Sequence, residues 1–269
     1  MANQYTAHKE EWKRLADIDY FGLFVKSYIP FNAWMNVSYT GQDLGSDRAK
    51  INAIKKDPNP FRNKICALLN ANNQEGSYFR GLIGELHDLL ENHYIYNQDK
   101  RISFTCIIIG KNPTNLSTYS YRGITYRVQY GNGVPGNTQT EVLIKNHAGD
   151  AIVHITQPDY DIDGLKAHQK FIAITQDERK KRLLNCYTQV EPYIVKDFTT
   201  GFDINDEKSF YQCGNYKFIK EGENLAKGLI EIIYNMRNTL FHGELIPDDD
   251  ANRTYGAAYK ILRTLINAI

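Results

Sequence analysis

The amino-acid sequence predicts a mainly α-helical protein, α+β overall, in which a helical bundle carries a small antiparallel β insertion. Two observations support this fold class. Apolar residues recur at helical spacing toward both ends of the chain, whereas residues 100–156 alternate and contain many β-branched side chains. A chain of 269 residues is long enough to bury a substantial core in one or two domains. We therefore expect bundle helices at 1–99, the β insertion at 100–156, and further bundle helices at 157–269.

The N-terminal part contains four segments with helical character. Apolar residues from 6 to 29 follow a helical period, and Pro30 is expected to kink or end this first helix. Residues 43–57 and 61–69 predict two shorter helices, and a fourth begins near Ser77, a suitable N-cap. The first segment has a wide apolar face with few basic residues, so it is expected in the core rather than on a membrane surface.

The rest of the chain changes from strands back to helices. The HAGD sequence at 147–150 separates two strand-like runs, which predicts a hairpin within a sheet of three to five strands. Helices are expected at 175–195, with Thr175 as N-cap, and at 216–242, ended by Gly243. A last amphipathic helix follows.

The charge balance and the cysteine pattern exclude several classes of protein. The chain has 32 Lys and Arg residues against 31 Asp and Glu residues. The net charge of +1 excludes a protein that coats nucleic acid or an anionic membrane through bulk charge. The four cysteines show neither a C-x-x-C pair nor zinc spacing, and no segment resembles a signal peptide or membrane span. We therefore expect a cytoplasmic protein with reduced thiols and with no metal, cofactor or membrane attachment.

The most informative stretch lies in the penultimate helix, at residues 232–243. On a helical wheel Asn238 and His242, four residues apart, share a polar face. Arg237 and His242 are five residues apart, about 140° around the helix axis, so on one ideal helix they do not face a common point. Either a distorted last turn before Gly243 brings them together, or two copies of the helix meet across a symmetric dimer.

Two apolar arcs run along the same helix. The arc expected to face the core comprises Leu225, Leu229, Ile232, Met236 and Leu240. A second arc, beside Arg237, comprises Ala226, Ile230, Ile233 and Phe241. The second arc favours a further contact surface on this helix, and therefore a homodimer.

The polar residues of this stretch suit phosphodiester chemistry. A histidine can take or give a proton near neutral pH. An arginine clamps a phosphate whose negative charge grows in the transition state, and an asparagine can orient the histidine or donate to a phosphate oxygen. In RNA the 2′-hydroxyl lies beside the scissile phosphate and can act as the nucleophile without a metal.

Arg237, Asn238 and His242 match in type and order the signature of the HEPN family, and NTLFHG at 238–243 resembles its fuller form. The resemblance implies an α-helical bundle and a metal-independent, often dimeric ribonuclease of prokaryotic antiviral defence or toxin–antitoxin systems. The specific likeness covers about 12 residues. Arg80 and His87 fit the loosest form of the pattern but lack the asparagine and the terminal glycine, and we interpret them as a chance match.

Two further groups are candidates for RNA contact. Arg179, Lys180, Lys181 and Arg182 form a basic run at the start of a helix, although such a run is more often a solvated face. Arg122 and Arg127 alternate with tyrosines over 119–130, where rings can stack on unpaired bases. Tyrosine is also simply a good strand former, which is the favoured alternative.

Two hypotheses of different classes follow. The first is a homodimeric endoribonuclease in which His242 is the general acid and base, Arg237 stabilises the phosphorane-like transition state and Asn238 orients. Its partners would be RNA and an antitoxin or another defence protein. The second is a non-catalytic HEPN-like module that uses the same helices for dimerisation or binding.

Overall fold

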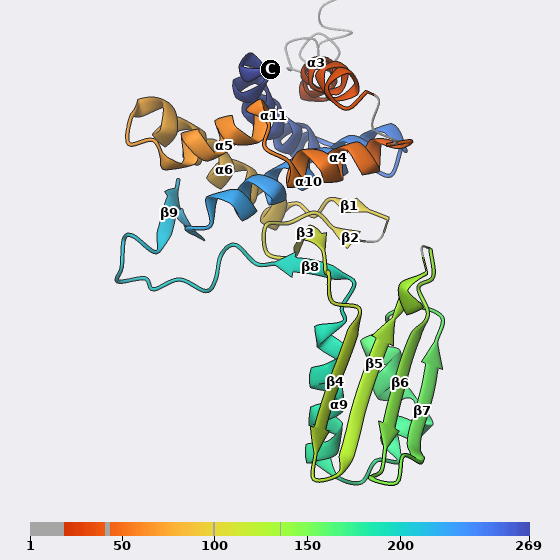
Figure 1. Ribbon diagram of the computed structural model, residues 1–269. Helices are drawn as coiled ribbons and strands as arrows, with labels where there is room; N and C mark the ends of the chain where they lie inside the picture. Colours follow the sequence, from red (N-terminus) through yellow and green to blue (C-terminus); the bar gives the residue numbers. More distant parts are fainter. Residues whose placement is uncertain (1–18, 41–43, 99, 135) are drawn as a thin grey trace, which may run out of the picture. The chain divides into compact units, whose positions relative to one another are not determined.

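The computed structural model describes residues 19–40, 44–98, 100–134 and 136–269 (Figure 1). About half of the chain is helical, and the strands form small antiparallel sheets, which confirms the predicted α+β class. The chain divides into two compact units: residues up to 109 together with 195–269, here called the helical unit, and residues 110–194, here called the sheet unit. Residues 6–18 of the first predicted helix lie outside the described residues.

The helical unit is built mainly from α-helices that surround one apolar core. These helices are α3 (Tyr20–Ser38), α4 (Asp47–Lys56), α5 (Pro60–Asn70), α6 (Gln74–Asn92), α10 (Gly222–Phe241) and α11 (Asp249–Leu265). Two short hairpins accompany them: β1 (Tyr96–Asn97) with β2 (Lys100–Arg101), and β9 (Phe210–Cys213) with β10 (Tyr216–Ile219). The chain leaves this unit in β3 (Ile107–Lys111) and returns in β8 (Tyr193–Lys196).

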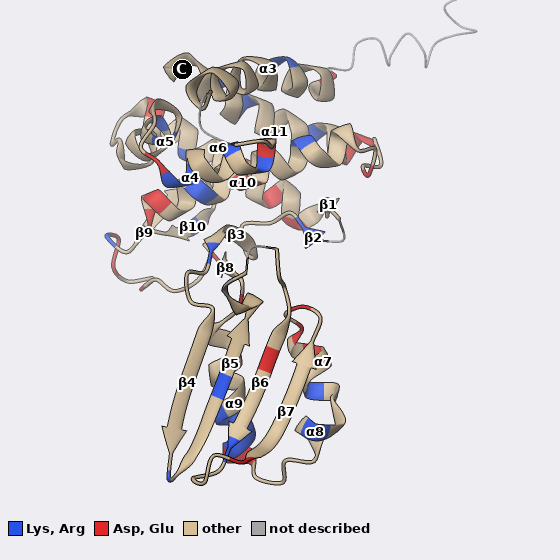
Figure 2. Ribbon diagram, turned by 45° about the vertical axis from the view of Figure 1, so that its right-hand side comes forward, with Lys and Arg blue, Asp and Glu red and all other residues tan. Residues whose placement is uncertain are grey.

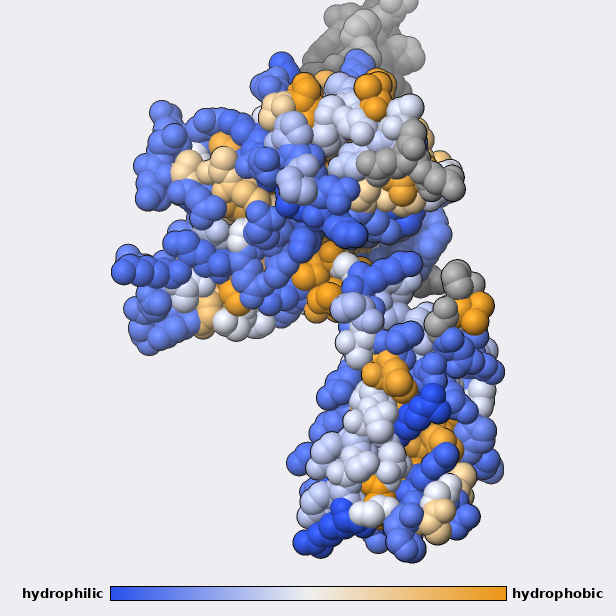
Figure 3. All heavy atoms as spheres, viewed as in Figure 1, coloured by the Kyte–Doolittle hydropathy of each residue, from blue (hydrophilic) through white to orange (hydrophobic). Residues whose placement is uncertain are grey.

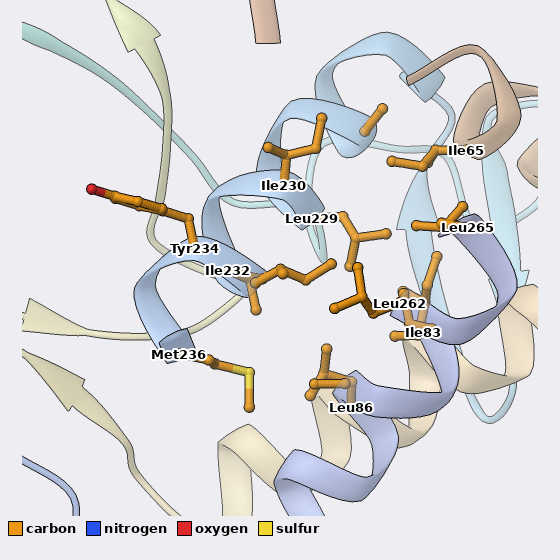
Figure 4. Packing of buried hydrophobic residues seen from close by; sticks show 14 of the residues in the cluster. Ile65, Ile83, Leu86, Leu229, Ile230, Ile232, Tyr234, Met236, Leu262 and Leu265 are labelled. Carbon is orange, nitrogen blue, oxygen red and sulfur yellow. The ribbon is translucent and has the colours of Figure 1, made fainter. Parts of the chain in front are cut away.

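The core of the helical unit lies between α10, α6 and α11. Figure 4 shows Leu229, Ile232 and Met236 of α10 directed toward Leu86 of α6 and Leu262 of α11. All five side chains are fully buried, and each contributes about 1.5–3 kcal/mol by leaving water. The predicted core-facing arc of α10 is therefore confirmed, and this packing fixes the opposite face of α10 in position.

Several element boundaries differ from the sequence prediction. α3 continues through Pro30, because Phe31 and Met35 beyond it are buried and Pro30 itself is exposed, where water can satisfy the freed carbonyl. Asn73, not Ser77, caps α6: its side-chain Oδ1 accepts the Gly76 amide at 2.9 Å.

The predicted long helix at 216–242 begins only at Gly222. The preceding segment, Tyr216–Ile219, is strand β10, which pairs with β9 across a tight turn that contains Gly214 at φ +60°. Its aromatic and apolar residues suit a strand against the core, where Phe218 is fully buried. Helical spacing of a few apolar residues was therefore not sufficient to exclude a strand here.

The sheet unit has one four-stranded antiparallel sheet with helices against one face. Its strands, in spatial order, are β4 (Leu116–Tyr121), β5 (Ile124–Tyr130), β6 (Thr140–Lys145) and β7 (Ala151–Gln157). The β6–β7 connection falls on the predicted hairpin turn. The helices are α7 (Ile162–Ala167), α8 (Gln169–Ile172) and α9 (Asp177–Gln189).

The inserted unit is larger than the sequence predicted. α9 was assigned to the bundle, but its buried residues Leu183 and Tyr187 pack with Tyr126 and Val142 of the sheet. Its cap is Gln176 rather than Thr175, without a side-chain hydrogen bond. Conversely, residues 100–109 belong to the helical unit. An amphipathic helix needs only an apolar neighbour, so its sequence does not reveal which core it joins.

The outer surface is mixed in polarity. The face of each unit seen in Figure 3 is largely hydrophilic, with hydrophobic residues in small groups. Among the described helices, none combines the length and the apolarity needed to cross a lipid bilayer.

Candidate functional site

The end of α10 has a defined backbone geometry that places His242. The amide of Glu244 donates to the Thr239 carbonyl at 3.1 Å, and the amide of Gly243 donates to the Leu240 carbonyl at 3.4 Å. Gly243 has φ +68°, so this is the Schellman arrangement in which a left-handed glycine ends a helix. The predicted stop at Gly243 is confirmed. His242 is the C-cap residue that follows the last helical residue, Phe241, and its side chain is exposed.

Arg237 is directed toward α3 and α4. Its Nη1 donates to Asn238 Oδ1 at 3.0 Å, and its Nη2 lies 3.5 Å from Asp47 Oδ2 at the start of α4. The guanidinium carbon lies 4.7 Å from the ring centroid of Phe241 and 5.8 Å from that of Tyr28. The side chain retains 23% exposure, so the guanidinium is fixed on several sides and still reaches the surface.

Two buried donors beside this guanidinium have no acceptor among the described residues. They are Nε of Arg237 and the hydroxyl of Tyr28, whose residue is only 4% exposed. Burial raises the pKa of Tyr28 well above its usual value, although the charge of Arg237 opposes this. The hydroxyl therefore stays protonated near neutral pH. An unsatisfied buried donor costs about 1–3 kcal/mol, a penalty that an anion or a polar ligand would relieve.

A buried acidic residue on α10 was missed by the sequence analysis. Glu231 is 3% exposed, and its carboxylate accepts from Lys55 Nζ at 2.7 Å and from Arg48 Nη1 at 2.7 and 2.9 Å. Both cations come from α4, which packs against α10 (Figure 1). Burial lowers the pKa of Lys55, and the adjacent Glu231 carboxylate counteracts that shift. These contacts tie α4 to α10 one to two turns before Arg237.

The spacing of Glu231 carried a signal that could have revealed it. Glu231, Asn235, Asn238 and His242 recur every three or four residues and therefore form one polar face of α10. Asn235 Oδ1 accepts from Arg48 at 3.4 Å, so the face is linked to α4 over more than one turn. A polar stripe on an otherwise apolar helix predicts a buried network.

The charges around this face are unevenly balanced. Arg48, Lys55 and Arg237 supply three cations, whereas Asp47 and Glu231 supply two carboxylates. Figure 2 shows both signs of charge on α4 and α10. The excess positive charge favours an anionic ligand in this region, even though the net charge of the whole chain is only +1.

The predicted catalytic residues are only partly brought together. Asn238 and Arg237 are hydrogen-bonded, but no hydrogen bond joins the side chains of Arg237 and His242. The apolar arc that favoured a dimer is also not free. Ala226, Ile230 and Ile233 are at most 1% exposed in the chain's own core, and only Phe241 is exposed. That argument for a dimer was therefore wrong, because helix amphipathicity does not show how many neighbours a helix has.

The second match to the loose motif is structural. Arg80 Nη1 donates to the backbone carbonyls of Leu69 and Ala71 at 2.9 and 2.8 Å. His87 is buried against the rings of Tyr216 and Phe218, and this burial lowers its pKa. Arg80 is thus engaged by backbone carbonyls and His87 is buried, in agreement with their interpretation as a chance match.

The RNA candidates of the sheet unit divide into two places. Arg122, in the β4–β5 turn, and Arg182, on α9, both lie over the ring of Tyr121. Arg127 lies on the opposite face of the sheet, because successive strand residues point to opposite sides. There its Nη1 lies 3.9 Å from Glu141 Oε2 of the neighbouring strand β6. Figure 2 shows basic colour on β5 and acidic colour on β6. Arg127 therefore does not act together with the tyrosines, contrary to the prediction.

The basic run on α9 is also not one continuous surface. Lys180 lies 5.8 Å from the ring centroid of Phe171, and Lys181 is exposed. Arg179 and Arg182 are partly buried, and Arg182 also contacts Glu178 at 3.5 Å. Helical geometry thus places Arg179 and Arg182 one turn apart on the side that faces the sheet.

The described ranges contain no group of three or more His, Cys, Asp or Glu residues placed to hold a metal ion. The four cysteines are free. Burial raises the pKa of the Cys213 thiol to about 12 and that of Cys66 to about 11, so neither is an activated nucleophile.

Comparison with protein-family models, curated proteins and solved structures finds no match to this chain.

Proposed function

We propose that this protein is a metal-independent endoribonuclease of the HEPN type, with Arg237, Asn238 and His242 as its catalytic residues. One observation carries the proposal. Beside the end of α10, Nε of the partly exposed Arg237 and the buried hydroxyl of Tyr28 on α3 are donors without an acceptor among the described residues, and the exposed His242 follows Arg237 by five residues. Donors held in place before the substrate arrives are what a developing phosphorane requires.

Each residue has a defined task in this mechanism. His242 takes the proton from the 2′-hydroxyl of RNA, and the resulting oxygen attacks the adjacent phosphorus. Arg237 neutralises the charge that grows on the phosphoryl oxygens. Asn238 uses its carbonyl oxygen to hold Arg237, which leaves its amide group for a phosphate oxygen. The P–O5′ bond then breaks as the protonated His242 gives its proton to the departing 5′-oxygen, which leaves a 2′,3′-cyclic phosphate and a 5′-hydroxyl end.

The divergence of Arg237 and His242 favours an active homodimer. Within one chain the guanidinium lies toward α3 and α4, whereas the imidazole is at the outer end of α10. A two-fold axis near this end would let His242 of the partner subunit serve the Arg237 of the first. With the resemblance, the proposal extends to a HEPN-like bundle in the helical unit and to antiviral defence or a toxin–antitoxin pair, with an antitoxin or another defence protein as partner.

A non-catalytic binding module is the second candidate, and one contact favours it. Asp47 pairs with the Arg237 guanidinium, which is what a purely structural arginine would do, and in that pair it competes with a phosphate for the same donor. The carboxylate oxygen lies 3.5 Å from Nη2, longer than a strong charge-assisted hydrogen bond, so it can be displaced. Loss of partner binding on Arg237→Ala, without any RNA cleavage by the wild type, would support this candidate.

The test is cleavage of mixed RNA in EDTA by the wild type and by matched variants. His242→Ala is expected to reduce the rate by about 10²–10⁴-fold, the usual contribution of a general acid or base. His154→Ala is the control for His242→Ala, because His154 is an exposed histidine of the sheet unit. Arg253→Ala is the control for Arg237→Ala, because Arg253 also pairs with an aspartate. Equal cleavage by wild type and His242→Ala, or activity only with added metal, would refute the mechanism.

A further inference from the structure

Two groups of cations that are sixty residues apart in sequence meet at one tyrosine ring in the sheet unit. The guanidinium carbon of Arg182, on α9, lies 4.2 Å from the ring centroid of Tyr121, and that of Arg122 lies 5.2 Å from it. Arg179 lies one turn before Arg182, and its buried Nε has no partner among the described residues. Arg122 and Arg182 therefore share one ring, and Arg179 lies on the same side of α9 as Arg182.

The backbone at Arg122 is unusual for an arginine. Arg122 has φ +48° and Gly123 has φ +74°, and they form the two-residue turn between Tyr121 and Ile124. Such turns require left-handed backbone at both positions, and asparagine, aspartate or glycine normally supply the first. An arginine held there against its conformational preference indicates that its side chain serves a purpose other than folding.

The aromatic residues near these cations are accessible. Tyr119 and Tyr121 are two residues apart on the edge strand β4, so they point to the same side, and they are 45% and 37% exposed. Tyr119 also lies beside Tyr126, with ring centroids 6.2 Å apart. The carboxylate of Glu178, 3.5 Å from Arg182, partly offsets the positive charge of these arginines. Partly exposed rings beside guanidinium groups suit bases and phosphates rather than a lipid surface, which would require exposed aliphatic residues.

We propose that Tyr119, Tyr121, Arg122 and Arg182 form a binding site for single-stranded nucleic acid. The Tyr121 ring holds the two guanidinium groups, which contact phosphates, and the exposed ring of Tyr119 offers its π-face to a base without sequence preference. This site is separate from the one on α10 and is a property of the sheet unit. Only the choice of RNA over DNA as its ligand rests on the proposed function.

The test uses the full chain with His242→Ala and a fluorescein-labelled oligouridylate in which every 2′-hydroxyl is methylated, so that no cleavage interferes. Fluorescence anisotropy should show binding about tenfold weaker for Arg122→Ala/Arg182→Ala, and the dependence of log K on log[salt] should lose about 1.4 in slope, for two phosphate contacts. Tyr121→Ala should also weaken binding about tenfold. Arg127→Ala, on the other face of the same sheet, should leave affinity within about twofold.

Arg122→Asn separates binding from folding, because asparagine tolerates left-handed backbone. It should melt at the same or a higher temperature and still bind the oligonucleotide more weakly. Equal losses for Arg127→Ala and the Arg122/Arg182 variant would overturn the proposal. The proposal would also be overturned if the protein bound phosphatidylserine vesicles in a manner that depends on Arg122 and did not bind the oligonucleotide.

Failure of the nuclease hypothesis is distinguishable from failure of this one. If wild-type protein never cleaves RNA but the oligonucleotide binds through Arg122 and Arg182, the proposed function fails and this site stands. If RNA is cleaved through His242 while the Arg122/Arg182 variant binds normally, the reverse holds.

Discussion

The buried ion pair between Glu231 and Lys55 makes the stability of the helical unit unusually sensitive to one substitution. Glu231→Ala removes the carboxylate that Lys55 Nζ contacts at 2.7 Å, at a place where both side chains are at most 4% exposed. Breaking one partner of a buried pair typically costs about 3–5 kcal/mol, because the other charge remains in low dielectric. For a chain of this size that corresponds to a decrease in Tm of about 6–20 °C.

The pH dependence of this variant follows from the direction of the Lys55 shift. Burial lowers the folded-state pKa of Lys55, so between that pKa and the ordinary lysine pKa of 10.5 the unfolded chain binds more protons. Stability therefore rises with pH across this window. Without the Glu231 carboxylate, which raises the Lys55 pKa, the folded-state pKa of Lys55 decreases further. The pH range over which stability rises with pH therefore extends to lower pH. The deficit of Glu231→Ala should thus decrease as the pH rises from neutral toward 10.

The assay is thermal unfolding followed by circular dichroism, with two comparison variants. Glu75→Ala removes a surface pair with Lys64 at 2.8 Å and should cost less than about 1 kcal/mol. Lys55→Met/Glu231→Leu removes both charges and should regain most of the lost stability. A loss for Glu231→Ala no greater than that for Glu75→Ala, or a double variant as unstable as Glu231→Ala, would refute the reasoning.

Three further predictions concern the site at the end of α10. Asp47→Asn removes the carboxylate that competes for Arg237, so binding of methylated RNA should tighten several-fold in an anisotropy titration; weaker binding would show that Asp47 positions Arg237 instead. Gly243→Ala should lower the free energy of unfolding in a urea melt by about 1 kcal/mol, because φ at this position is +68°. Gly81→Ala in the interior of α6, where an added Cβ also meets no neighbour, should raise the free energy of unfolding by about 0.5–1 kcal/mol. Tyr28→Phe removes an unpaired buried hydroxyl, so Tm should stay the same or rise while RNA cleavage slows; cleavage at the wild-type rate would exclude a role for this hydroxyl.

Local sequence patterns predicted the parts of the site that depend on one helix. The core-facing arc of α10 and its end at Gly243 both follow from spacing and from the conformational freedom of glycine. The exposure of His242 follows from that end. These features need only short-range information, so one sequence was sufficient to predict them.

The remaining features of the site depend on contacts between distant segments. Asp47 and Arg48 come from α4, almost two hundred residues before the residues of α10 that they contact. The period of α9 predicts a helix but not its packing on the sheet rather than on the bundle. Similarly, the approach of Arg182 to Tyr121 has no counterpart in sequence spacing. Tertiary packing decides each of these, and periodicity reports only which face is apolar.

Attack by the 2′-hydroxyl is the central claim, and a pair of substrates tests it most directly. Wild-type protein in EDTA is incubated with an RNA oligonucleotide and with the same sequence methylated at every 2′-oxygen, and the ends are identified by mass spectrometry. We predict cleavage of the RNA alone, with 2′,3′-cyclic phosphate and 5′-hydroxyl ends, and loss of that cleavage in His242→Ala. Cleavage of the methylated strand, or 5′-phosphate ends, would contradict the mechanism.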